Sequence, residues 1–60
     1  MIELTFTFDR DTKNARRFNE NLNGRERGVV GTLYVLKSDL EKAFGTLPVA
    51  IAVTIGPEGV

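Results

Sequence analysis

The clearest pattern in the sequence is the alternation of apolar and polar residues at the start of the chain. Four large apolar residues occupy every second position there: Ile2, Leu4, Phe6 and Phe8. Glutamate and threonine fill the positions between them. A period of two is typical of a strand with one buried face. The sequence therefore predicts a strand over Ile2–Phe8, with its four apolar side chains on one face.

Two later segments also have the residues of strands. Val29–Lys37 is largely apolar on both faces, which is typical of a central strand covered on both sides, and Gly31 within it predicts a bulge or the close approach of another backbone. In Val49–Ile55 large and small residues alternate, which predicts a third strand. The tail 56–60 contains two glycines and a proline, and we expect it to fray.

A short helix is expected between these two strands. Ser38 and Glu41 have the spacing of a capping box, in which each side chain accepts a hydrogen bond from the backbone N–H of the other residue. The helix is predicted over Asp39–Phe44, and Gly45 stands where a left-handed terminating residue is expected.

The segment 13–20 leaves two alternatives open. Aspartates in the preceding Asp9–Thr12 favour a turn, so 13–20 is either a return strand or a helix capped by Asp11. The asparagines weaken a helix, and we favour the strand. The polar loop 21–28 follows and is expected to be mobile. The sequence thus predicts one α+β domain over 1–60, a small antiparallel or mixed sheet of three to four strands with one helix, in the order β-β-β-α-β.

Composition narrows the chemistry of this chain. Its 60 residues include no cysteine and no histidine, and eight basic residues balance eight acidic ones. Disulfides, zinc sites built on Cys or His, and Ser-His-Asp or Cys-His catalysis are therefore excluded. We expect a protein that is not an enzyme, with no catalytic residue, no cofactor and no metal. No apolar segment approaches the roughly 20 residues that span a bilayer, so we expect a cytoplasmic protein without a membrane partner.

The candidate binding residues lie in the middle of the chain, where six of the eight positive charges fall between positions 10 and 27. The predicted site for a nucleic acid or a protein partner is Lys13, Arg16, Arg17, Arg25 and Arg27. Arginines there bind phosphates or acidic surfaces, although a charged edge strand is the plainer interpretation.

Other features are interpreted structurally. Tyr34 has the spacing of a core residue rather than a stacking platform. Asp9 and Asp11 fail the pattern of a calcium loop, because Lys13 and Asn14 follow at the fifth and sixth positions. The segment 24–31 contains three glycines but lacks the signature of a phosphate loop, and its glycines are interpreted as flexible.

The segments 31–45 and 49–55 resemble AbrB-like swapped-hairpin domains. Lys37, Leu40, Phe44 and Gly45 fall at matching places, with Leu36 where that family usually has proline. The resemblance implies an intertwined dimer that binds DNA through arginines of an N-terminal strand and the adjoining loop, the region of the arginines between 16 and 27. The chain is also similar to short uncharacterised reading frames of bacteria and phages.

The expected function is therefore a non-catalytic small binding module, a dimeric AbrB-like DNA-binding protein. The alternative is a protein-binding inhibitor or adaptor encoded by a phage or mobile element, which binds an acidic protein surface. In both cases we expect a homodimer.

Overall fold

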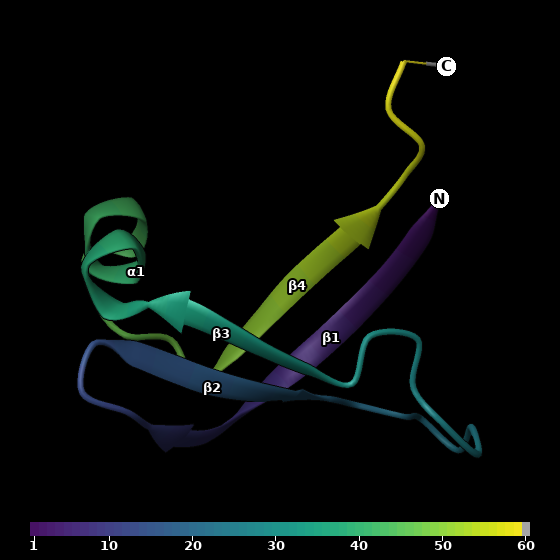
Figure 1. Cartoon of the computed structure of the whole chain (residues 1–60), viewed down its shortest axis with the longest axis horizontal. Helices are drawn as coiled ribbons and strands as arrows, with labels where there is room; N and C mark the ends of the chain where they lie inside the picture. The colour runs from purple at the N-terminus through teal and green to yellow at the C-terminus, as the bar shows by residue number, and fades with distance from the viewer. Residues whose placement is uncertain (60) are drawn as a thin grey trace.

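The computed structural model describes residues 1–59, which form one sheet and one helix (Figure 1). The elements are β1 (Ile2–Asp11), β2 (Ala15–Glu20), β3 (Thr32–Leu36), α1 (Lys37–Phe44) and β4 (Ala50–Ile55). The predicted α+β fold and its β-β-β-α-β order are confirmed, and the segment after the first turn is a strand as expected. Val60, the end of the predicted tail, lies outside the described residues.

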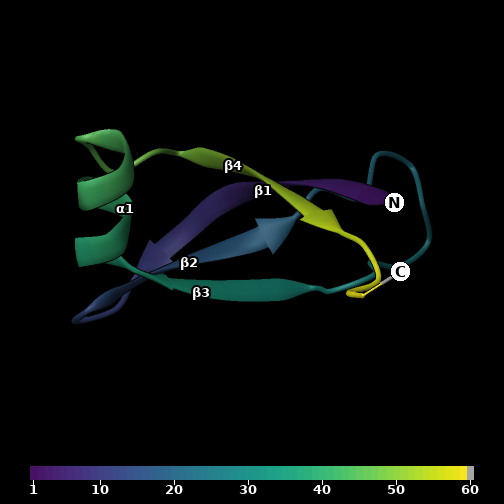
Figure 2. The same cartoon turned by 90° about the horizontal axis from the view of Figure 1, so that it is seen from above.

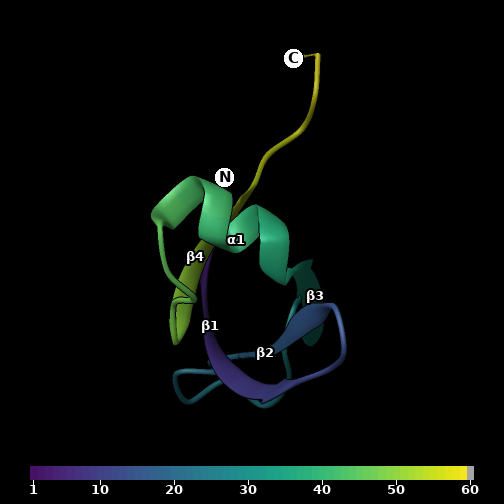
Figure 3. The same ribbon diagram turned by 90° about the vertical axis from the view of Figure 1, so that its left-hand side faces the viewer.

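The four strands form a single antiparallel sheet in the order β3-β2-β1-β4. The sheet is strongly curled, and Figure 2 shows α1 at one end of it. Seen from that end, the sheet is a trough with α1 lying across its opening (Figure 3). The sheet therefore has a concave face, partly covered by the helix, and an outer face that no element of residues 1–59 covers.

The structure corrects the expected places of two strands. β3 lies at an edge of the sheet and not at its centre, and it begins at Thr32 rather than Val29. The arginine-bearing β2 lies inside the sheet, so its interpretation as a charged edge strand is wrong. β3 has apolar residues on both faces, but its outer face is not buried, because Tyr34 and Leu36 are 60% and 52% exposed there.

The core lies on the concave face and is small. Four hydrophobic residues are buried there: Leu4, Phe6, Phe18 and Leu40. Partly buried side chains from β3, β4 and the segment after α1 pack around them. Cross-strand pairing explains the set, because Phe6 lies opposite Ile51 and Phe18 lies opposite Leu33. The alternation in β1 therefore directs its middle apolar residues into the core.

The start of α1 differs from the prediction and its end does not. The helix begins at Lys37, directly after β3, with Leu36 as N-cap and no side-chain cap, so the predicted capping box is wrong. The reason is that Lys37 continues the β3 ladder, donating its N–H to the carbonyl oxygen of Asn14 at 2.9 Å. Gly45 ends the helix as predicted, with φ of 75° and its N–H donating to the carbonyl oxygen of Glu41.

The turn between β1 and β2 comes later than expected. β1 continues to Asp11, and a β-bulge between Phe8 and Arg10 accommodates the first aspartate. The chain reverses over Thr12–Ala15, where the N–H of Thr12 donates to the carbonyl oxygen of Ala15 at 2.8 Å. The predicted Asp9–Thr12 turn is therefore wrong in its position, since ladder pairing overrides the local turn preference of aspartate.

We expect Phe6→Ala to unfold most of the protein. The Phe6 side chain is completely buried, so its truncation removes about 3–5 kcal/mol of stability, which is most of what a domain of this size has. Chemical denaturation followed by circular dichroism measures the loss. Val29→Ala, at a position 53% exposed, is the control and shifts stability by no more than about 0.5 kcal/mol. A cooperatively folded Phe6→Ala of wild-type stability would contradict the assigned core.

Candidate functional site

A buried carboxylate organises the loop that contains two of the predicted arginines, Arg25 and Arg27. Glu20, the last residue of β2, is only 8% exposed. Its carboxylate oxygens accept hydrogen bonds from three consecutive backbone N–H groups, those of Val29, Val30 and Gly31, at 2.8–3.0 Å. Nη2 of Arg25 donates to the same carboxylate at 2.8 Å. The loop thus encloses an anion that the chain itself supplies.

Two glycines of this loop, Gly28 and Gly31, have specific structural roles that their interpretation as flexible positions did not include. A Cβ atom on Gly28 would lie 2.7 Å from Oε1 of Glu20, which is closer than real contacts allow. Gly31 has φ of 94°, in the region that L side chains rarely adopt. Glycine is therefore required here because the backbone approaches a carboxylate closely and turns sharply.

The hydrogen bonds around Glu20 also fix its charge. The N–H groups of Gly31 and Val30 stabilise the ionised carboxylate, burial opposes them, and the balance lowers the pKa of Glu20 to about 2. Glu20 is therefore charged at neutral pH. Because this carboxylate occupies the backbone N–H groups, the loop offers them to no external phosphate.

Arg16 is held within the fold. Its Nε lies 2.9 Å from Oδ1 of Asp11, and its Nη1 donates to the carbonyl oxygen of Pro48 at 3.2 Å. The guanidinium carbon lies 4.3 Å from the centroid of the Phe8 ring, and the side chain is only 11% exposed. The hydrogen bond from Arg16 lowers the pKa of Asp11. Arg16 thereby joins β1 and β2 to the segment before β4.

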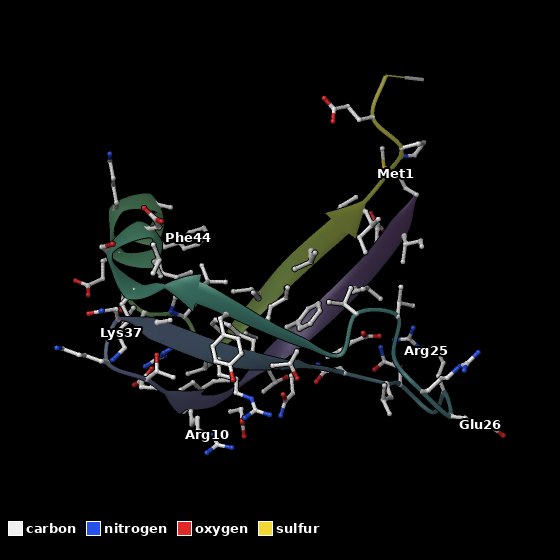
Figure 4. The ribbon with its side chains drawn as sticks, viewed as in Figure 1. Met1, Arg10, Arg25, Glu26, Lys37 and Phe44 are labelled. Carbon is white, nitrogen blue, oxygen red and sulfur yellow. The ribbon has the colours of Figure 1, made fainter. Side chains whose placement is uncertain are left out.

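The other predicted binding residues are distributed over the two ends of β2. Arg25 donates from Nε to the carbonyl oxygen of Leu22 at 2.8 Å, in addition to its contact with Glu20. Lys13 precedes β2 and Arg27 follows it, and both residues are exposed. Figure 4 shows Arg25 at the loop end of the molecule, far from Lys37, whose N–H donates to the carbonyl oxygen of Asn14 next to Lys13. The structure therefore does not bring the five predicted residues together.

Arg17 instead belongs to a cluster on the outer face of the sheet. Its guanidinium carbon lies 6.0 Å from the ring centroid of Tyr34, and its Nε lies 3.1 Å from Oδ2 of Asp9. Oδ2 of Asp9 is also 3.5 Å from Nε of Arg10, which is labelled in Figure 4. We call Asp9, Arg10, Arg17 and Tyr34 the outer-face patch.

For two members of the outer-face patch, the structure differs from what the sequence predicts. Tyr34 was expected in the core, yet it is 60% exposed, because its neighbour across the ladder is Arg17 on the outer face. Arg10 was not among the predicted site residues. The bulge after Phe8 shifts the register and places Arg10 opposite Arg17. A simple alternation counted along the sequence cannot show this shift.

Comparison with protein-family models, curated proteins and solved structures finds no significant match for this chain. The resemblance of residues 31–55 to AbrB-like domains therefore stays a prediction. No helix among residues 1–59 is long and apolar enough to cross a membrane. In the same described part of the chain, no three acidic side chains gather as a metal site would require.

We expect the stability of the protein to fall as the pH is lowered from about 4.5 to about 2. The pKa of Glu20 is about 2 in the folded state against an ordinary 4.5, so its stabilising contribution is complete above pH 4.5 and is lost towards pH 2. Melting temperatures measured across this range test the effect. Glu20→Gln melts at a lower temperature at neutral pH and has a flatter pH dependence; parallel curves for the two proteins would contradict the assigned role of Glu20.

We expect Gly28→Ala to lower the melting temperature by about 5 °C or more, since its methyl group displaces the Glu20 carboxylate from the loop N–H groups. Gly56→Ala is the matched control, because a Cβ there meets only a Met1 side-chain carbon at an ordinary 3.5 Å. Differential scanning calorimetry compares the two variants. Equal melting temperatures would show that the loop does not depend on this close approach.

Proposed function

We propose that this chain is a non-catalytic protein-binding module and that its outer-face patch docks on an acidic surface of another protein. The observation that carries the proposal is the exposure of Tyr34, which is 60% exposed beside Arg17, with Arg10 opposite Arg17 on the next strand. Tyrosine and arginine are enriched among the residues that dominate protein–protein binding free energy. An exposed aromatic ring at this place is available for such a contact.

The charge of the outer-face patch supports a protein partner. Arg10 and Arg17 contribute two positive charges and Asp9 removes one, which leaves a net charge of +1. The Arg10 side chain is 67% exposed, and the Arg17 side chain is 27% exposed. A partner carboxylate is the group that planar guanidinium donors bind in a bidentate manner. The patch therefore matches a local acidic site better than a polyanion.

DNA binding, as the AbrB-like resemblance implies, is the competing proposal. Affinity for duplex DNA requires several positive charges free to neutralise phosphates. Arg16 and Arg25 donate to acceptors within the chain, and Arg17 lies against Asp9. The balance of charge thus favours a protein partner over DNA.

We also infer that the module acts as a homodimer. Among residues 1–59, four hydrophobic residues form the buried core, whereas eleven large hydrophobic side chains are substantially exposed. A domain of about 60 residues buries a smaller share of its surface than a larger domain does, so association is a common route to stability at this size. A second copy would cover part of this exposed apolar surface.

Titration with fluorescent duplex DNA distinguishes the two partner classes. We expect no saturable change of anisotropy at about 50 mM salt, and the same result at about 200 mM. Saturable binding whose affinity falls steeply with salt would overturn the protein-binding proposal in favour of DNA, since that dependence is the signature of released counterions.

Affinity capture followed by cross-linking tests the patch itself. We expect a protein captured by the wild type to be retained by Val29→Ala, which removes an exposed apolar side chain outside the patch, and lost by Tyr34→Ala. Hot-spot truncations typically weaken binding by about 2 kcal/mol or more, roughly 30-fold. Equal capture by the wild type and Tyr34→Ala would show that the partner binds elsewhere.

A further inference from the structure

The free edge of β4 lacks the usual protection of an edge strand. β4 is the last strand of the sheet and pairs only with β1. Its six residues, Ala50–Ile55, include no charge and no proline, and no bulge interrupts the ladder with β1. Natural edge strands usually carry such features, because an unprotected edge recruits another strand. The free edge of β4 is therefore suited to pairing.

The ladder determines which backbone groups point to this edge. The N–H of Phe8 donates to the carbonyl oxygen of Val49 at 2.7 Å, so this pair is hydrogen-bonded. Hydrogen-bonded and non-bonded pairs alternate along an antiparallel ladder. The residues of β4 that direct both N–H and C=O away from β1 are therefore Ala50, Ala52 and Thr54. These six groups form a regular row that no group of residues 1–59 pairs.

An open apolar groove lies along the same edge. It has a volume of about 410 Å³ and is lined by Phe44, Pro48, Ala50, Ile51 and Ala52. Phe44, labelled at the end of α1 in Figure 4, is 63% exposed, and Val49 is 68% exposed. The edge thus combines unpaired backbone groups with apolar surface that side chains of an added strand would cover.

The sequence of β4 suits antiparallel pairing with a second copy of the same strand. Around Ala52 the residues form a near-palindrome of size and shape: Val49 and Ile55, Ala50 and Thr54, Ile51 and Val53. If two copies pair antiparallel about an axis at Ala52, every opposed pair on the concave face is β-branched and every pair on the outer face is small. β-branched cross-strand pairs stabilise a sheet, and no like charges meet.

We propose that a second copy of this chain binds along the free edge of β4, with the two β4 strands antiparallel and related by a two-fold axis at Ala52. The two four-stranded sheets then form one continuous sheet of eight strands. Three opposed pairs that each exchange two hydrogen bonds give six bonds across the interface. Such an interface uses the same surface on both copies, which the near-palindrome permits. The inference rests on the proposed homodimer and specifies its interface.

Light scattering over a concentration series tests whether the β4 edge forms the interface and whether the two β4 strands pair about Ala52. The double variant Ala50→Lys with Thr54→Lys places two like-charged pairs across the interface and is expected to raise the dimer dissociation constant roughly tenfold or more. Ala50→Glu with Thr54→Lys makes the same pairs opposite in charge, and we expect it to stay a dimer. Circular dichroism verifies that each variant is folded.

The matched control is Thr32→Lys with Leu36→Lys, since these residues hold the corresponding outward positions on the free edge of β3. We expect this variant to dimerise like the wild type. A wild type that dimerises and is unaffected by the two lysines on β4 would leave the homodimer standing and overturn the β4 interface. A monomeric wild type at tens of micromolar would overturn both. Loss of the dimer only in the control would assign the interface to β3.

Discussion

The binding of the Glu20 carboxylate by the N–H groups of Val29, Val30 and Gly31 determines how the second half of the chain joins the first. The backbone of Glu20 contributes too, because its N–H donates to the carbonyl oxygen of Gly31 at 2.9 Å. Side chain and backbone of one residue thus hold three successive residues of the loop. β3 begins immediately afterwards, at Thr32, so its register on β2 follows from this contact. A buried charge is tolerated here because its oxygens are hydrogen-bonded.

The elements of the fold could be predicted largely from local patterns, whereas their arrangement could not. The alternation in Ile2–Phe8 and Val49–Ile55 identifies strands, because burial of one face imposes a period of two on the sequence. Strand order depends on contacts between distant segments, so the apolar Val29–Lys37 appeared central although β3 is an edge. The capping box at Ser38 failed for a related reason, since the ladder of β3 extends to Lys37 and sets where the helix begins.

The candidate site was predictable only as a set of residue types. Counting charges identifies an arginine-rich segment but not the acceptor of each guanidinium. Arg16 meets Asp11 across the hairpin and Arg25 reaches back to Glu20 from the loop. The first of these pairs depends on the position of the turn and on the bulge after Phe8, and the second depends on the fold of the loop after β2. The pattern along the sequence misplaces the turn and shows neither the bulge nor the fold of the loop. The exposure of Tyr34 likewise depends on the register of β3 on β2, which places Tyr34 opposite Arg17 on the outer face.

The charged residues of this sheet are not on its edge strands, where most sheets carry them. Arginines lie on the interior strand β2, whereas the edge strands β3 and β4 carry no charge. Two charged side chains of β2 nevertheless position the edge strands. Arg16 donates to the carbonyl oxygens of Leu47 and Pro48 just before β4. Glu20 holds the loop just before β3. Loss of binding on substitution of Arg16 would therefore not by itself indicate a phosphate contact. In this protein a partly buried cation influences a free edge of the sheet by placing the backbone that leads into it.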